Sequence, residues 1–108
     1  MNKEVNQKMS QQQILTLIVD AASHDDLVDT LMGLESITGF TQSSVNGFSH
    51  AHAQFDIAEQ VAGHRELFRF DVQHEAPQLE RLLATIKELR TANGIHYWVT
   101  PVLASGKL

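Results

Sequence analysis

Three of the six histidines in this chain of 108 residues lie in one stretch, at His50, His52 and His64. If a strand continues through the first two, their side chains project to the same side and can share one metal ion. Imidazole nitrogens bind Zn, Cu, Ni and Co. His64 supplies a third ligand if the intervening chain returns as a hairpin does, and Asp56 or Glu59 can complete the shell. This pattern predicts a divalent transition-metal site, and solvated loop histidines are the more common alternative for an H-x-H pair.

The acidic residues of the same stretch also have a structural explanation. Asp56 can cap a helical turn, Glu59 follows it at the spacing of a capping box, and Gly63 can end the turn. A short helix over residues 57–62 would order this part of the chain. We therefore interpret Glu59 as a structural residue rather than as a metal ligand.

His64, Arg65 and Arg69 form a small basic cluster at the end of this stretch. Guanidinium groups bind phosphate and carboxylate in a bidentate manner. Both arginines are therefore candidates for holding an anion at a cleft between subunits. The favoured alternative is a surface pairing with Glu66 or Asp71.

No catalytic constellation is recognisable in the sequence. The chain has no cysteine and no G-x-S-x-G nucleophile elbow, and nothing places His24 and its neighbour Asp25 in a pocket. His74 and His96 are predicted to be surface or edge residues rather than ligands. We therefore expect a protein that is not an enzyme.

The composition restricts the partners and the compartment. A net charge of −5 argues against nucleic acid as a partner and against an anionic membrane surface. No continuous apolar stretch precedes Ile14, so the sequence predicts neither a signal peptide nor a membrane span. The absence of cysteine is compatible with a reducing compartment. We expect a cytoplasmic protein without direct membrane insertion.

The first half of the chain predicts a strand, a helix and a second strand. Residues 14–19 form a continuous apolar and largely β-branched run, which is typical of a central strand buried on both faces. Ser23 and Asp26 form a capping box that begins a helix over residues 25–36. The strand at residues 40–48 is too polar to be central, so we expect it at an edge of the sheet.

The second half of the chain predicts a strand, a helix and a last strand. Residues 66–72 alternate with the period of a strand. Pro77 begins a helix, which Asn93-Gly94 ends in a left-handed cap. Residues 95–102 form the last strand, and Pro101 confines it to an edge because proline has no N–H to donate.

The resulting β-α-β-β-α-β order predicts an α+β fold, a ferredoxin-like sandwich with sheet order 4-1-3-2 and both helices on one face. Residues 1–12 are predicted to be a flexible N-terminal tail, and residues 13–108 a single domain.

Two helices cover only one face of such a sheet. A lone chain would leave apolar side chains of the first strand in water, together with part of the strand that carries Tyr97 and Trp98. Large exposed apolar patches mark interfaces. We therefore expect a homo-oligomer, a dimer or a trimer, in which the sheets face one another. The alternative is a monomer with a few exposed apolar residues.

The segment Val45-Asn46-Gly47-Phe48 resembles the V-x-G-F end of the second strand in PII (nitrogen regulatory) signalling proteins, where the long T-loop follows. The element order, the position of the long loop and the short tail after the last strand are also similar. Residues 58–63 and 97–102 resemble segments of a bacterial PII-like group that is often encoded beside heavy-metal efflux pumps. The resemblance covers residues 13–108. It implies a homotrimer with ligand clefts between subunits and loops that contact a partner protein.

The sequence departs from the PII pattern in three places. PII proteins carry a glycine-rich loop that cradles ATP phosphates, whereas residues 91–94 contain one glycine, which argues against ATP binding. The single tyrosine is Tyr97 in the last strand, so modification of a loop tyrosine is excluded. Lys107 is the nearest match to the C-terminal basic residue of the nucleotide site. It therefore joins Arg65 and Arg69 as a candidate cofactor-binding residue.

The sequence is thus expected to encode a PII-like sensor that binds a metal ion or a small ligand at residues 49–65 and at the cleft between subunits. Its partner would be a membrane transporter or another regulated protein, and metal efflux is the process that the resemblance implies. The alternatives are a small dimeric α+β barrel enzyme of ferredoxin-like fold and a metal chaperone.

Overall fold

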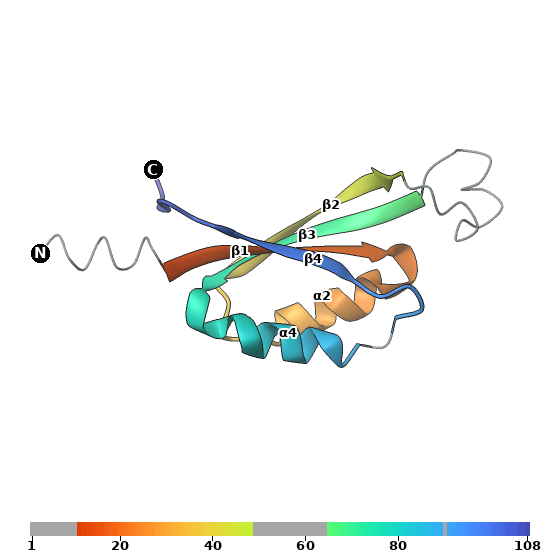
Figure 1. The fold of residues 1–108 in the computed structure, drawn as a ribbon, viewed down its shortest axis with the longest axis horizontal. Helices are drawn as coiled ribbons and strands as arrows, with labels where there is room; N and C mark the ends of the chain where they lie inside the picture. Colours follow the sequence, from red (N-terminus) through yellow and green to blue (C-terminus); the bar gives the residue numbers. More distant parts are fainter. Residues whose placement is uncertain (1–10, 49–64, 90) are drawn as a thin grey trace, which may run out of the picture.

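A four-stranded antiparallel sheet with two helices on one of its faces forms the fold (Figure 1). The computed structural model describes residues 11–48, 65–89 and 91–108. The strands are β1 (Gln12–Asp20), β2 (Gly39–Gly47), β3 (Arg65–Glu75) and β4 (His96–Pro101), and the helices are α2 (His24–Met32) and α4 (Leu79–Lys87). The strand order β2-β3-β1-β4 confirms the predicted α+β, ferredoxin-like arrangement.

The core lies between the sheet and the helices. The central strand β1 contributes Leu15, Leu17 and Val19 to it, and each of these side chains is at most 1% exposed. The remaining buried apolar side chains come from β3 and from the two helices: Phe70, Val72, Leu27, Leu31, Leu82 and Ile86. The apolar stripes in the sequence therefore face inward, as a helix needs for burial against a sheet.

The start of α2 differs from the predicted capping box. The Ser23 side chain makes no capping bond. Instead, Asp20 has an extended backbone at the end of β1, and its Oδ1 accepts a hydrogen bond of 3.1 Å from the backbone N–H of Ser23. This caps a 3-10 turn over Ala21–Ser23, from which α2 continues directly. The capping box was wrong because an extended backbone, which N-caps adopt, is found at Asp20.

Both helices are shorter than predicted. α2 ends at Met32, before the predicted end at residue 36, and α4 ends at Lys87. Gly94 does have the left-handed conformation expected of it, with φ of 72°, but it lies in the connection between α4 and β4 rather than at a helix end. Asn93 donates from Nδ2 to Asp20 Oδ2 at 3.1 Å and so ties this connection to the end of β1.

Both predicted edge strands, β2 and β4, lie at the edges of the sheet. The N–H of Val102 donates to the carbonyl of Gln12 at 3.0 Å. Because hydrogen-bonding groups alternate in direction along a strand, the nitrogen of Pro101 points away from β1. The proline therefore costs no ladder bond at this edge.

Two further predictions concern the ends and the surroundings of the domain. The predicted tail at residues 1–12 lies largely outside the described residues, although Gln12 already belongs to β1. Among the described residues, no helix is long and apolar enough to cross a membrane.

Candidate functional site

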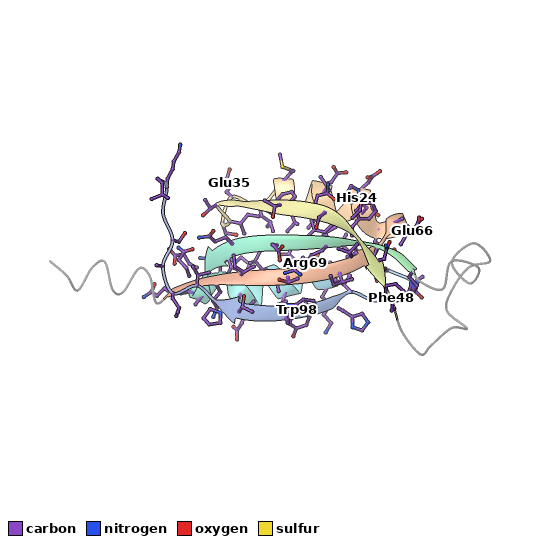
Figure 2. All side chains as sticks on the ribbon, turned by 90° about the horizontal axis from the view of Figure 1, so that it is seen from above. His24, Glu35, Phe48, Glu66, Arg69 and Trp98 are labelled. Carbon is purple, nitrogen blue, oxygen red and sulfur yellow. The ribbon has the colours of Figure 1, made fainter. Side chains whose placement is uncertain are left out.

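The sheet face opposite the helices, called the open face below, carries the candidate site. Figure 2 looks onto it, with Arg69 near the middle of the sheet and Trp98 on the edge strand β4. Strand alternation places Leu67, Arg69 and Asp71 of β3 on this face, since Phe70 and Val72 are buried on the other. β1 contributes Ile14, Thr16 and Ile18 by the same alternation.

A chain of side-chain contacts on the open face links β1, β3 and β4. Thr16 donates from its hydroxyl to Asp71 Oδ1 at 2.7 Å. Arg69 donates from Nε to both Asp71 oxygens, at 3.3 and 3.2 Å. The guanidinium carbon of Arg69 lies 5.9 Å from the ring centre of Trp98, within the range of a cation–π interaction. Asp71 and Trp98 therefore orient the guanidinium group from two sides. The predicted surface pairing of Arg69 with Asp71 is confirmed.

The burial of Thr16 shows how closely these side chains pack. Thr16 is only 1% exposed, although no described helix covers the open face. It pairs with Asp71 on one side and with Trp98 on the other. The larger side chains of its neighbours account for its burial, so the centre of the open face is a packed layer.

Arg65 lies on the same face as Arg69, at the beginning of β3 and opposite Gly47. Its Nε is buried and has no hydrogen-bond partner in the part of the chain that the structure describes. Residues 65 and 69 are four positions apart on an extended strand, so their Cα atoms are separated by roughly 13 Å. One small anion therefore cannot lie close to both Cα atoms. Their side chains can still converge on one larger ligand.

Lys107 is not near the two arginines in a single chain. The segment after β4 turns across the end of the sheet, where Gln73 donates from Nε2 to the hydroxyl of Ser105 at 2.9 Å. Gln73 lies near the far end of β3 from Arg65. The three predicted cofactor-binding residues therefore do not form one site within one chain.

The glycine of the V-x-G-F segment has a steric reason. A Cβ at Gly47 would meet Cδ1 of Leu67 on the neighbouring strand, so the Leu67 side chain would have to move to admit any other residue. Phe48 follows at the end of the described strand pair and is 75% exposed. The residues of this segment thus end the β2–β3 ladder at the point where the long connection begins.

The predicted metal ligands His50, His52 and His64 lie outside the described residues. Within the described ranges, no group of three or more His, Cys, Asp or Glu residues could hold a metal ion. His24 packs its ring against Phe68, with ring centres 4.3 Å apart, and its Nδ1 lies 2.8 Å from Asp25 Oδ1.

The prediction for His74 is wrong. This residue is only 1% exposed and lies on the helix side of β3, because it continues the alternation of Phe70 and Val72. Its Nδ1 donates to the carbonyl of Glu75 at 2.8 Å, and its Nε2 has no partner among the described residues. His96, by contrast, is exposed on the edge strand as predicted.

A cleft of about 730 Å³ lies between the end of α4 and β4, and sequence reasoning missed it. Its floor and walls are mainly apolar side chains: Leu17, Leu83, Ile86, Leu89, Ile95 and Tyr97. Lys87, Glu88 and Thr91 contribute polar groups. The signal in the sequence was Tyr97, an aromatic residue that strand alternation places on the helix side of β4. In the structure this residue is 53% exposed, because no described helix covers it.

Comparison with known proteins identifies relatives along nearly the whole chain. A family model described as "Protein of unknown function (DUF3240)" matches residues 9–108. The crystal structure of a DUF3240 family protein from Shewanella baltica is 34% identical in sequence, with a TM-score of 0.77. The match covers 93% of this chain and 99% of the other. No curated protein matches the sequence.

Proposed function

The chain belongs to the DUF3240 family, and from that premise we propose that it is a PII-like regulatory protein. It is a cytoplasmic, non-enzymatic homotrimer that binds a metal ion or a small ligand and thereby controls a partner protein. A transporter for metal efflux is the partner that the PII-like resemblance favours.

The observation that carries this proposal is the open face. Trp98 remains 44% exposed there, beside the aliphatic side chains of Ile14 and Ile18. Removing apolar surface from water gains about 25 cal/mol per Å². A stable interface typically buries roughly 800 Å² on each partner. Stacking of sheets in a trimer supplies this burial and leaves the helices on the outside.

The long connection between β2 and β3 provides the sensor part of the proposal. The two strands are paired as far as Gly47 and Arg65, so the ends of the connection start side by side. The connection is far longer than the two to five residues of an ordinary hairpin. Its histidines are the proposed ligands for Zn, Cu, Ni or Co. Binding would change the conformation of the connection and its docking to the partner, which is a known type of switch.

Two measurements test this function. Light scattering should give the mass of a trimer at micromolar protein concentration. Calorimetric titration with each of the four metals should show binding by the wild type that is reduced at least about tenfold in His50→Ala/His52→Ala. His96→Ala is the matched control, because it removes an exposed histidine from β4 and should leave binding unchanged. Equal affinity in the wild type and the double variant, or binding by neither, would reject the metal sensor.

The cleft between α4 and β4 favours a second candidate, a small dimeric enzyme. In the α+β barrel type of dimer, substrate lies between the sheet and the helices, and this cleft has that position. Its volume is within the range of roughly 300–1,000 Å³ that small-molecule sites have. A mass of two chains instead of three would favour the enzyme over the PII-like protein.

A further inference from the structure

We propose that Arg69 binds an oxyanion on the open face, and that this anion is part of the contact between stacked sheets. The inference rests on the proposed assembly through that face. It assigns a ligand class, carboxylate or phosphate, to a side chain that would otherwise be buried with unpaired donors. The anion comes either from solution or from a carboxylate of a second copy.

The guanidinium group of Arg69 is held in place before any ligand binds. Its Nε is used by Asp71, which Thr16 holds in turn, and its plane lies near Trp98 (Figure 2). Within the described ranges, the structure records no acceptor for its two terminal Nη groups. These groups carry four N–H donors in a planar fork, which is the geometry that matches carboxylate and phosphate.

The carboxylates of the same region do not satisfy these donors. Asp71 contacts Nε alone, at long hydrogen-bond distances of 3.2 and 3.3 Å. Asp20, at the end of β1, uses its two oxygens for the backbone N–H of Ser23 and for Asn93. Stacking a second sheet onto the open face would remove water from the Nη groups. Burying a charge without a partner is costly, so the interface requires an acceptor that the described residues of this region do not supply.

One further polar side chain on β4 fits an anion at Arg69 as well. His96 lies in the same row of the sheet as Arg69, beyond Ile18. The side chain of Arg69 already reaches towards β4, since it contacts Trp98. His96 lies two residues before Trp98 on the same side of the strand, about 7 Å away, and can donate to the same anion.

The only tryptophan of the chain makes this site directly measurable. Trp98 fluorescence is recorded while inorganic phosphate is titrated at constant ionic strength, with sodium chloride as the balancing salt. A solution anion predicts a saturable change for the wild type and a loss of apparent affinity of at least about tenfold for Arg69→Gln. Arg69→Lys keeps the charge without the fork and should bind more weakly than the wild type. Arg81→Gln, which removes an exposed charge from α4, is the matched control and should respond like the wild type.

Light scattering on the same samples distinguishes the two sources of the anion. If phosphate from solution is the ligand, it should shift the wild type toward the larger species at a given protein concentration. If a carboxylate of a second copy is the ligand, Arg69→Gln should associate more weakly at all phosphate concentrations, and phosphate should have no effect on the wild type. Both results support the site and identify its ligand.

The proposal is overturned if Arg69→Gln associates like the wild type and its fluorescence response to phosphate is also the same, including no response in either. This outcome is distinct from failure of the proposed function. A chain that is monomeric at every concentration rejects the stacked sheets, whereas a phosphate response lost in Arg69→Gln would still establish the anion site.

Discussion

The two faces of the sheet use the same strands for different purposes. On the helix side, Leu17, Phe70 and Val72 are at most 1% exposed and form an apolar core. On the open face, the alternate positions of β3 carry Arg69 and Asp71, which are charged and partly exposed. The helix side stabilises the single chain through packing, whereas the open face holds a preformed polar network with donors left over. Under the proposed function, the open face is the recognition surface.

The central strand β1 shows the contrast in one element. Its helix side presents leucine and valine, and its open side presents Ile14, Thr16 and Ile18. Thr16 is as deeply buried as the core residues, but neighbouring side chains cover it instead of helices. The open face is therefore an ordered surface, and changes on it should affect the single chain less than changes on the helix side. Three substitutions test this ranking, by their effect on the free energy of unfolding.

The largest effect is expected for Phe70→Ala on the helix side. Phe70 is fully buried and its ring packs near Phe40, with ring centres 6.0 Å apart. Deleting such a ring leaves a cavity, and we expect a loss of about 4 kcal/mol in the free energy of unfolding. Urea denaturation followed by circular dichroism measures it. Phe70→Leu is the control that keeps most of the volume and should lose clearly less. A loss below about 1 kcal/mol for Phe70→Ala would contradict the assignment of this face as the core.

The open face should give an intermediate effect at Thr16→Val. The substitution keeps the shape of the side chain but removes the donor to Asp71 Oδ1. A hydrogen bond to a charged group contributes roughly 1.5–3 kcal/mol. Partial exposure of Asp71 reduces this value, so we expect a loss of about 1 kcal/mol. Thr100→Val, at an exposed position of the same face, serves as the control and should be close to neutral. A gain in stability at position 16 would mean that the network does not stabilise the single chain.

Burial periodicity explains how much of this arrangement the sequence could predict. The alternation in β3 and the apolar run in β1 indicate which side chains are buried. The strand order and the edge positions could therefore be predicted from them. His74 obeys the same alternation, but its polar type obscured its burial. The cap at Asp20 depends on backbone conformation at a strand end, which residue types alone do not specify. Neither could the separation of Lys107 from Arg65 be predicted, because it depends on the path of the chain after β4.

The parts of the site also differ in how far the sequence could identify them. Arg69 and Asp71 were recognisable as a pair because they are two apart on one strand, which places them on one face. To recognise that Thr16 and Trp98 belong to the site, one must know the register of β1 with both neighbouring strands. Prediction of the cleft beside α4 depends on the length of that helix, which sequence reasoning overestimated. Sequence reasoning thus identified the residues of the site that are close in the chain, whereas the residues from distant segments became evident only from the structure.

The smallest effect on the single chain, and the sharpest test of the comparison, is expected for Trp98→Gln. Trp98 is 44% exposed on an edge strand, so its replacement should change the free energy of unfolding of the monomer by less than about 1 kcal/mol. In the proposed trimer the same ring would be buried, and its loss should weaken association by at least about tenfold. Sedimentation at several protein concentrations measures association, and urea denaturation at the lowest concentration measures the free energy of unfolding of the single chain, because the stability of an oligomer depends on protomer concentration. Leu103→Gln, at an exposed residue after β4, is the control. If Trp98→Gln destabilises the chain as strongly as Phe70→Ala and leaves association unchanged, the roles assigned to the two faces are reversed at this position.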